Sequence, residues 1–165
     1  MSPATSPRPA SLAFLIATYL GLLIGGIVLF YVIIFVMEEF AGLAFPENNS
    51  MGLILIAVAT MTTGQIWYNR ERVEPSSRRK WVLALCLTVV TVAIQAAFIW
   101  MVASVAGQLS QFTRELGGRD GTLIIGVFAF LIVLELLMIR ASVWWGVRGA
   151  IKQEQRKAAK EALPR

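Results

Sequence analysis

Four long apolar stretches dominate the pattern of hydrophobic and polar positions along this chain. They are residues 11–37, 51–68, 81–106 and 121–146. A helix rises about 1.5 Å per residue, so crossing a hydrocarbon core of about 30 Å takes roughly 20 apolar residues. The stretches are continuously apolar, whereas the strands of a membrane barrel alternate apolar and polar positions. Because helices also satisfy their own backbone hydrogen bonds in lipid, the pattern predicts four transmembrane helices.

Composition supports this prediction. The four stretches hold 97 of the 165 residues but only two charged side chains, Glu135 and Arg140. Charged residues make up 15% of the chain, against about 25% in an ordinary soluble domain. A soluble globular domain, a disordered chain and a disulfide-stapled fold are therefore excluded. We predict an all-α membrane protein, with a four-helix transmembrane domain over residues 1–146 and a basic helical cytoplasmic tail over residues 147–165.

The basic residues outside the apolar stretches are distributed very unevenly. Twelve Lys and Arg side chains lie in the N-terminal tail, the second connection and the C-terminal tail, and two lie in the first and third connections. Loops rich in Lys and Arg stay on the cytoplasmic side of a membrane. The distribution therefore predicts that both termini are cytoplasmic (N-in/C-in).

The residues that usually carry catalysis or hold metals are scarce. The chain has no histidine and a single cysteine, Cys86, so the common ligands of haem and zinc are missing. It has no glycine-rich phosphate loop, nucleophile elbow or HExxH motif. We therefore predict no enzymatic activity, no cofactor and no metal. The net charge of +5 is what the topology requires, so we expect membrane lipids and other membrane subunits or self as partners, and no nucleic acid.

Small and hydroxyl residues recur at helical spacing within the first three stretches. Gly21 and Gly25 form a GxxxG pair, which allows two helix backbones to approach closely. The corresponding faces of the second and third stretches contain Thr60, Thr63, Gly64 and Trp67, and Ala84, Thr88, Thr91 and Gln95. We interpret these faces as the inner surfaces of one bundle. A contact through Gly21 and Gly25 to a second copy or a partner is the alternative.

Two polar residues are costly to place in lipid. Gln95 lies 14 residues, about 21 Å, from the start of its stretch, and Glu135 lies 11 residues, about 16 Å, from the end of its own. We predict an intramembrane polar cluster of Glu135, Gln95, Thr88 and Thr91, in which a neutral Glu135 bonded to Gln95 joins the third and fourth helices. A proton- or cation-coupled transport site, or a contact with a partner or lipid, is the alternative.

The remaining charges predict an interface with lipid headgroups. Arg140 lies within reach of the cytoplasmic interface, so we expect it to snorkel toward phosphates with Trp144 against its guanidinium. The other predicted interface residues are Trp145, Arg148, Lys152, Arg156 and Lys160. The last four form an i, i+4 ladder that lies on headgroups or projects into the cytoplasm. Gly146 and Gly149 predict a hinge where this tail leaves the membrane.

The sequence Gly-Gln-Ile-Trp-Tyr-Asn-Arg at residues 64–70, followed by Arg72, Pro75 and Ser76, resembles a family of small, functionally uncharacterised four-helix inner-membrane proteins of proteobacteria. The resemblance implies the same topology and a location in a bacterial inner membrane, and no activity. In size the chain is also similar to small four-helix multidrug exporters. Those carry their essential carboxylate in the first helix, where this chain has none.

These observations favour a non-catalytic, multi-pass membrane protein that acts through helix packing. It would be an accessory or structural subunit of a larger membrane complex, or a homo-oligomer. The alternative is a small proton-coupled transporter that uses Glu135. A protein that senses lipid or tethers the membrane through its basic tail is a third hypothesis.

Overall fold

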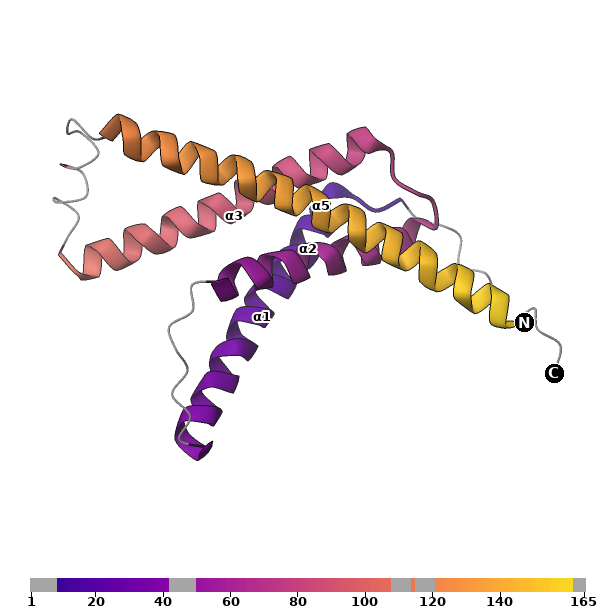
Figure 1. Cartoon of the computed structure of the whole chain (residues 1–165), viewed down its shortest axis with the longest axis horizontal. Helices are drawn as coiled ribbons and strands as arrows, with labels where there is room; N and C mark the ends of the chain where they lie inside the picture. Colours follow the sequence, from indigo (N-terminus) through magenta and orange to yellow (C-terminus); the bar gives the residue numbers. More distant parts are fainter. Residues whose placement is uncertain (1–8, 42–49, 108–113, 115–120, 162–165) are drawn as a thin grey trace.

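The computed structural model describes residues 9–41, 50–107, 114 and 121–161, and this part of the chain forms four long helices (Figure 1). They are α1 (Leu12–Ala41), α2 (Ser50–Glu71), α3 (Ser77–Val105) and α5 (Gly121–Glu161). Each is long and apolar enough to cross a membrane. The predicted all-helical, multi-pass class is therefore confirmed, whereas the sides on which the termini lie stay predictions.

The helices differ greatly in length. At about 1.5 Å per residue, the 22 residues of α2 extend about 33 Å, and the 41 residues of α5 extend about 61 Å. The second value is about twice the thickness of a hydrocarbon core. The predicted hinge at Gly146 and Gly149 is wrong, because both glycines lie inside the unbroken α5 helix and face α2.

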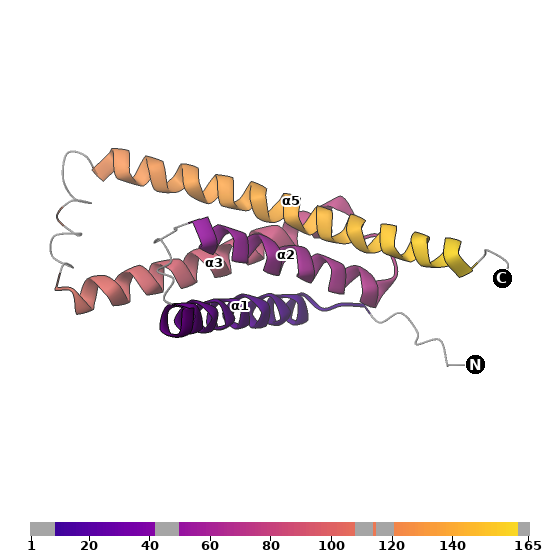
Figure 2. The same cartoon turned by 60° about the horizontal axis from the view of Figure 1, so that its bottom comes forward.

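The α2 helix occupies the centre of the molecule and separates α1 from α5 (Figure 2). Its closest approach is to α5, at two glycines. A Cβ atom on Gly64 would lie 2.7 Å from the Val143 carbonyl oxygen, and one on Gly146 would overlap the carbonyl oxygen of Met61. Because glycine has no side chain, the two backbones touch directly, as small residues permit between membrane helices.

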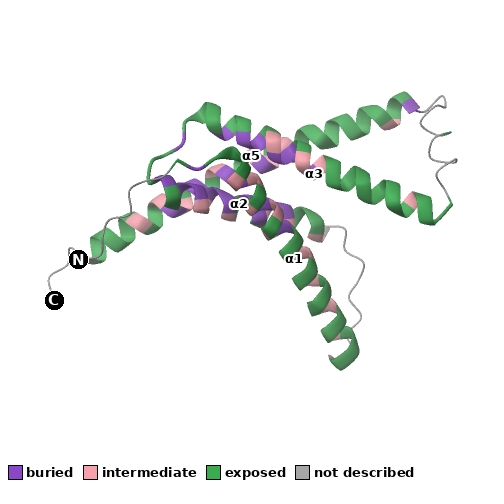
Figure 3. Cartoon of the chain, turned by 180° about the vertical axis from the view of Figure 1, so that it is seen from behind, coloured by how far each residue is buried: buried purple, intermediate pink, exposed green. Residues whose placement is uncertain are grey.

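Among the described residues, buried side chains gather in one half of the bundle (Figure 3). The last buried side chains toward the other half are those of Leu23 in α1, Ile56 in α2, Thr91 in α3 and Glu135 in α5, and beyond them only Gly121, at the start of α5, is buried. In that other half α1 diverges from α3 and α5 (Figure 1). We call the packed half, which contains Ala10 and Glu71, the closed end, and the diverging half the open end.

The small-residue faces predicted from the sequence behave differently from one another. Thr60, Thr63 and Trp67 are buried in the closed end, as expected for an inner face. Gly21 and Gly25 are exposed, and a Cβ atom on either would have no neighbour within 4 Å among the described residues. The interpretation of this pair as part of the inner surface is therefore wrong, and its contact with a second copy or partner stays a prediction.

Candidate functional site: a polar layer below an open cleft

The predicted pair Gln95 and Glu135 meets where the closed end gives way to the open end. Gln95 projects from α3, and its Nε2 donates a hydrogen bond to Oε1 of Glu135 on α5 over 3.4 Å. This distance is long for a hydrogen bond, so the contact is weak. Glu135 is only 9% exposed, whereas Gln95 is exposed. The carboxyl group thus lies inside the bundle, whereas the Gln95 side chain is accessible from outside it.

A second hydrogen bond joins α1 to α3 at nearly the same level. The fully buried Tyr19 hydroxyl lies 2.6 Å from Oγ1 of Thr91, which itself donates to the Leu87 carbonyl oxygen over 2.8 Å. Since a threonine hydroxyl has one proton, Tyr19 must be the donor to Thr91. Sequence reasoning missed Tyr19, although a phenol within an apolar stretch needs a hydrogen-bond partner once it is buried.

The other predicted members of the polar cluster do not reach the Gln95–Glu135 pair. Thr88 donates to the carbonyl oxygen of Ala84 over 2.9 Å, and Thr91 bonds as described above. In the described part of the chain, neither hydroxyl contributes a hydrogen bond to Gln95 or Glu135. The polar layer is thus two separate pairs, one between α1 and α3 and one between α3 and α5.

A cleft of about 510 Å³ opens above this layer, between α1, α2 and α3. Its walls are mainly apolar and include Ile27 and Phe30 from α1, Leu55 from α2 and Phe98 from α3. Thr91 and Gln95 also line it and supply a hydroxyl and an amide near the level where burial ends. The cleft is within the size range of ligand pockets, which is about 300–1,000 Å³. It can therefore accept apolar groups together with a hydrogen-bonding group.

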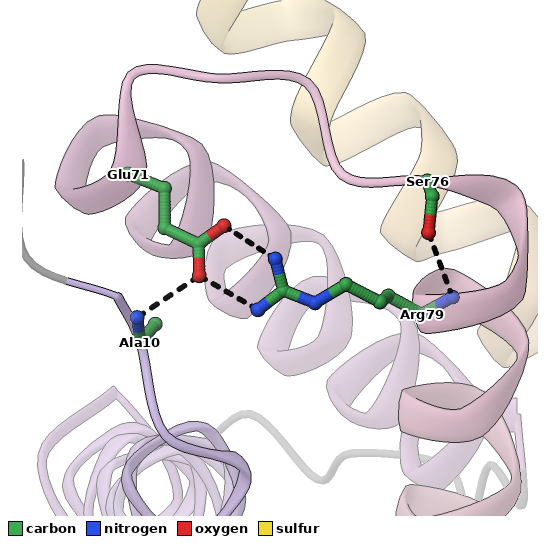
Figure 4. Close-up of polar contacts among 4 residues, drawn as sticks. All are labelled: Ala10, Glu71, Ser76 and Arg79. Carbon is green, nitrogen blue, oxygen red and sulfur yellow. Dashed lines mark hydrogen bonds and ion pairs between the residues drawn. The ribbon is translucent and has the colours of Figure 1, made fainter.

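The closed end is held together by a buried carboxylate that sequence reasoning missed (Figure 4). Glu71, at the end of α2, accepts two hydrogen bonds from the Arg79 guanidinium over 2.8 and 2.9 Å, and one from the Ala10 backbone N–H over 2.9 Å. Ser76 caps α3 by accepting from the Arg79 backbone N–H. The connection between α2 and α3 is thus fastened to the segment that precedes α1.

Further ion pairs join the same region to the extension of α5. Glu154 accepts from the Tyr68 hydroxyl over 2.8 Å and from Arg72 over 2.7 Å. These two contacts hold part of the predicted tail near the end of α2.

Glu74, in the connection between α2 and α3, pairs with Lys80 of α3 over 2.7 Å. The hydrogen bond and charge of Lys80 hold the pKa of Glu74 below its ordinary value.

The predicted interface residues are distributed along α5. Arg140 lies over the ring of Trp81 on α3, with its carbon Cζ 5.4 Å from the ring centre, and the expected partner Trp144 lies instead against Arg148 at 4.2 Å. The expected stacking of Arg140 on Trp144 is therefore wrong, because Trp81 takes that place. The other members are exposed, namely Trp145, Arg148, Lys152, Arg156 and Lys160.

No family model matches this chain, and no curated protein and no solved structure is detectably similar to it. The resemblance of residues 64–76 to small inner-membrane proteins of proteobacteria therefore stays a prediction. Among the described residues, no group of three or more cysteine and carboxylate side chains gathers as metal ligands would.

Proposed function

We propose that this chain is a non-catalytic accessory subunit of the bacterial inner membrane, with both termini cytoplasmic. Its open cleft would receive a transmembrane helix of another subunit or of a second copy. The observation that carries the proposal is that the burial of side chains stops partway along each helix, at Leu23, Ile56, Thr91 and Glu135. The uneven distribution of Lys and Arg among the connections supports the orientation.

The polar groups in the cleft favour a protein occupant over lipid tails. The side-chain amide of Gln95 donates one of its two N–H groups to Glu135. Gln95 also lines the cleft, so its second N–H and its carbonyl oxygen remain for an occupant. An acyl chain offers no hydrogen bond to an amide, whereas Ser, Thr, Asn or backbone groups of a helix do. A partner helix would therefore satisfy the amide and cover the apolar walls together.

A photo-crosslinking experiment in native membranes tests this proposal. A photoreactive residue at Phe98, which lines the cleft, should give one discrete product with a defined partner or a second copy. The matched control is Val89 on the same helix, which is similarly exposed (67%, against 59% for Phe98) but outside the cleft lining. Equal yields from the two positions, or purification of the chain as a monomer without a stoichiometric partner, would contradict the proposal.

The alternative is proton-coupled transport, favoured by the hydrogen bond between Glu135 and Gln95, whose side chain lines the cleft. The Glu135→Gln variant separates the two functions. It keeps the shape of the side chain and a hydrogen bond to Gln95 but can no longer carry a proton. Survival of the partner complex with Glu135→Gln supports the accessory subunit. Loss of a measurable flux or drug resistance in a folded variant would favour transport instead.

A further inference from the structure

A second, smaller cavity of about 370 Å³ lies at the closed end, between α1 and α3. Leu12 and Leu15 of α1 form one wall, and Val82 and Leu83 of α3 form the other. Two arginines, Arg78 and Arg79, line the same cavity. We call it the α1–α3 groove. It combines apolar walls with positive charge at the start of α3, a combination that points to an amphiphilic, anionic occupant.

The two arginines differ in whether a carboxylate of the chain already pairs with their positive charge. Arg79 is paired with Glu71 through two hydrogen bonds (Figure 4). The carbon Cζ of its guanidinium also lies 5.3 Å from the ring centre of Trp67. Its side chain is still 50% exposed, and three of its five N–H donors are free of Glu71. Arg78 forms no ion pair within the described residues. The groove therefore carries about one uncompensated positive charge and a fixed set of donors.

We propose that the α1–α3 groove binds an anionic phospholipid. One acyl chain lies along Leu12, Leu15, Val82 and Leu83, and the headgroup phosphate accepts hydrogen bonds from Arg78 and Arg79. Basic pockets between membrane helices recognise anionic headgroups in this way. The amine of a zwitterionic headgroup would find no free carboxylate, because Glu71 is already bonded to Arg79 and Ala10. This inference does not depend on what fills the open cleft.

The test uses the purified full-length chain in a neutral detergent. Phosphatidylglycerol should raise its melting temperature in a saturable way, whereas phosphatidylcholine and water-soluble glycerol phosphate should leave it nearly unchanged. A basic residue near an anionic headgroup contributes about 1 kcal/mol, which is about fivefold in affinity. The Arg78→Gln variant should therefore need about five times more phosphatidylglycerol for half of the stabilisation. Lys157→Gln, which removes the same charge from an exposed part of α5 outside the predicted headgroup interface, is the control.

A second variant separates the lipid tail from the headgroup. Val82→Trp places a large ring in the groove without changing any charge, and Val82 is 44% exposed, so the fold should tolerate it. It should abolish the saturable effect of phosphatidylglycerol, whereas Val89→Trp outside the groove should not. Equal stabilisation by both lipids, or equal behaviour of Arg78→Gln and Lys157→Gln, overturns the proposal. Stabilisation by glycerol phosphate alone would show a soluble-anion site and overturn it too.

Discussion

The direct backbone contact between α2 and α5 makes a quantitative prediction about Gly146. Replacing it with alanine places a methyl group onto the carbonyl oxygen of Met61. Neither backbone can move without displacing its helix, so α2 and α5 must separate along their whole contact. Forcing one extra methyl group into a close-packed interface costs about 1–3 kcal/mol. We expect Gly146→Ala to lower the free energy of unfolding by this amount.

Two matched substitutions isolate the packing effect. Alanine is a better helix former than glycine by up to about 1 kcal/mol, and this gain is common to every Gly→Ala variant within a helix. Gly25→Ala, which has no neighbour within 4 Å, should therefore leave stability equal or slightly higher. Gly64→Ala, with its Cβ 2.7 Å from the Val143 carbonyl oxygen, should lie between Gly25→Ala and Gly146→Ala.

The assay is reversible unfolding in mixed micelles, in which SDS is titrated into a mild detergent and helicity is followed by circular dichroism. The expected order of stability is Gly25→Ala, then Gly64→Ala, then Gly146→Ala. If Gly146→Ala proved as stable as Gly25→Ala, the close approach of α2 and α5 would be refuted. A shift of Gly25→Ala to lower stability would instead show that this face is packed within the chain.

Three further predictions concern the polar contacts and the topology. Glu71→Gln should lower the free energy of unfolding by about 1.5–3 kcal/mol in the same titration, because it removes charge-assisted hydrogen bonds at a buried group. Arg72→Gln, which breaks the exposed ion pair with Glu154, should change it little, and equal effects would contradict this. Thr91→Val should lower the free energy of unfolding more than Tyr19→Phe does, because Thr91→Val leaves the buried Tyr19 hydroxyl without an acceptor. The reverse order would mean that Tyr19 is not the donor. In a Cys86→Ser background, a cysteine at position 152 should react with a membrane-impermeant maleimide only after spheroplasts are lysed; labelling of intact spheroplasts would place the tail outside.

The number and approximate position of the helices followed from the sequence, because what a membrane-spanning helix requires is met within its own segment of the chain. Each residue in a lipid core must be apolar, and each backbone group must be bonded within its own helix, so a run of apolar residues is sufficient evidence. The unbroken course of α5 could not be found in this way. The sequence predicts a helical tail after residue 146 but separates it from the span by a hinge, whereas one helix runs to Glu161. Hydrogen bonds from Tyr68 and Arg72 to Glu154 hold that extension near the end of α2.

The meeting of Gln95 and Glu135 was also predictable, because the rise per residue converts sequence position into depth. The choice of packing faces was not. Gly21 and Gly25 form the more recognisable motif, yet Gly64 and Gly146 make the contact. In lipid an apolar helix face has nearly the same free energy of solvation outside the bundle as inside it, so the hydrophobic effect does not direct a small-residue face to the interior. Close packing between particular backbones decides it, and that is a property of the tertiary structure alone.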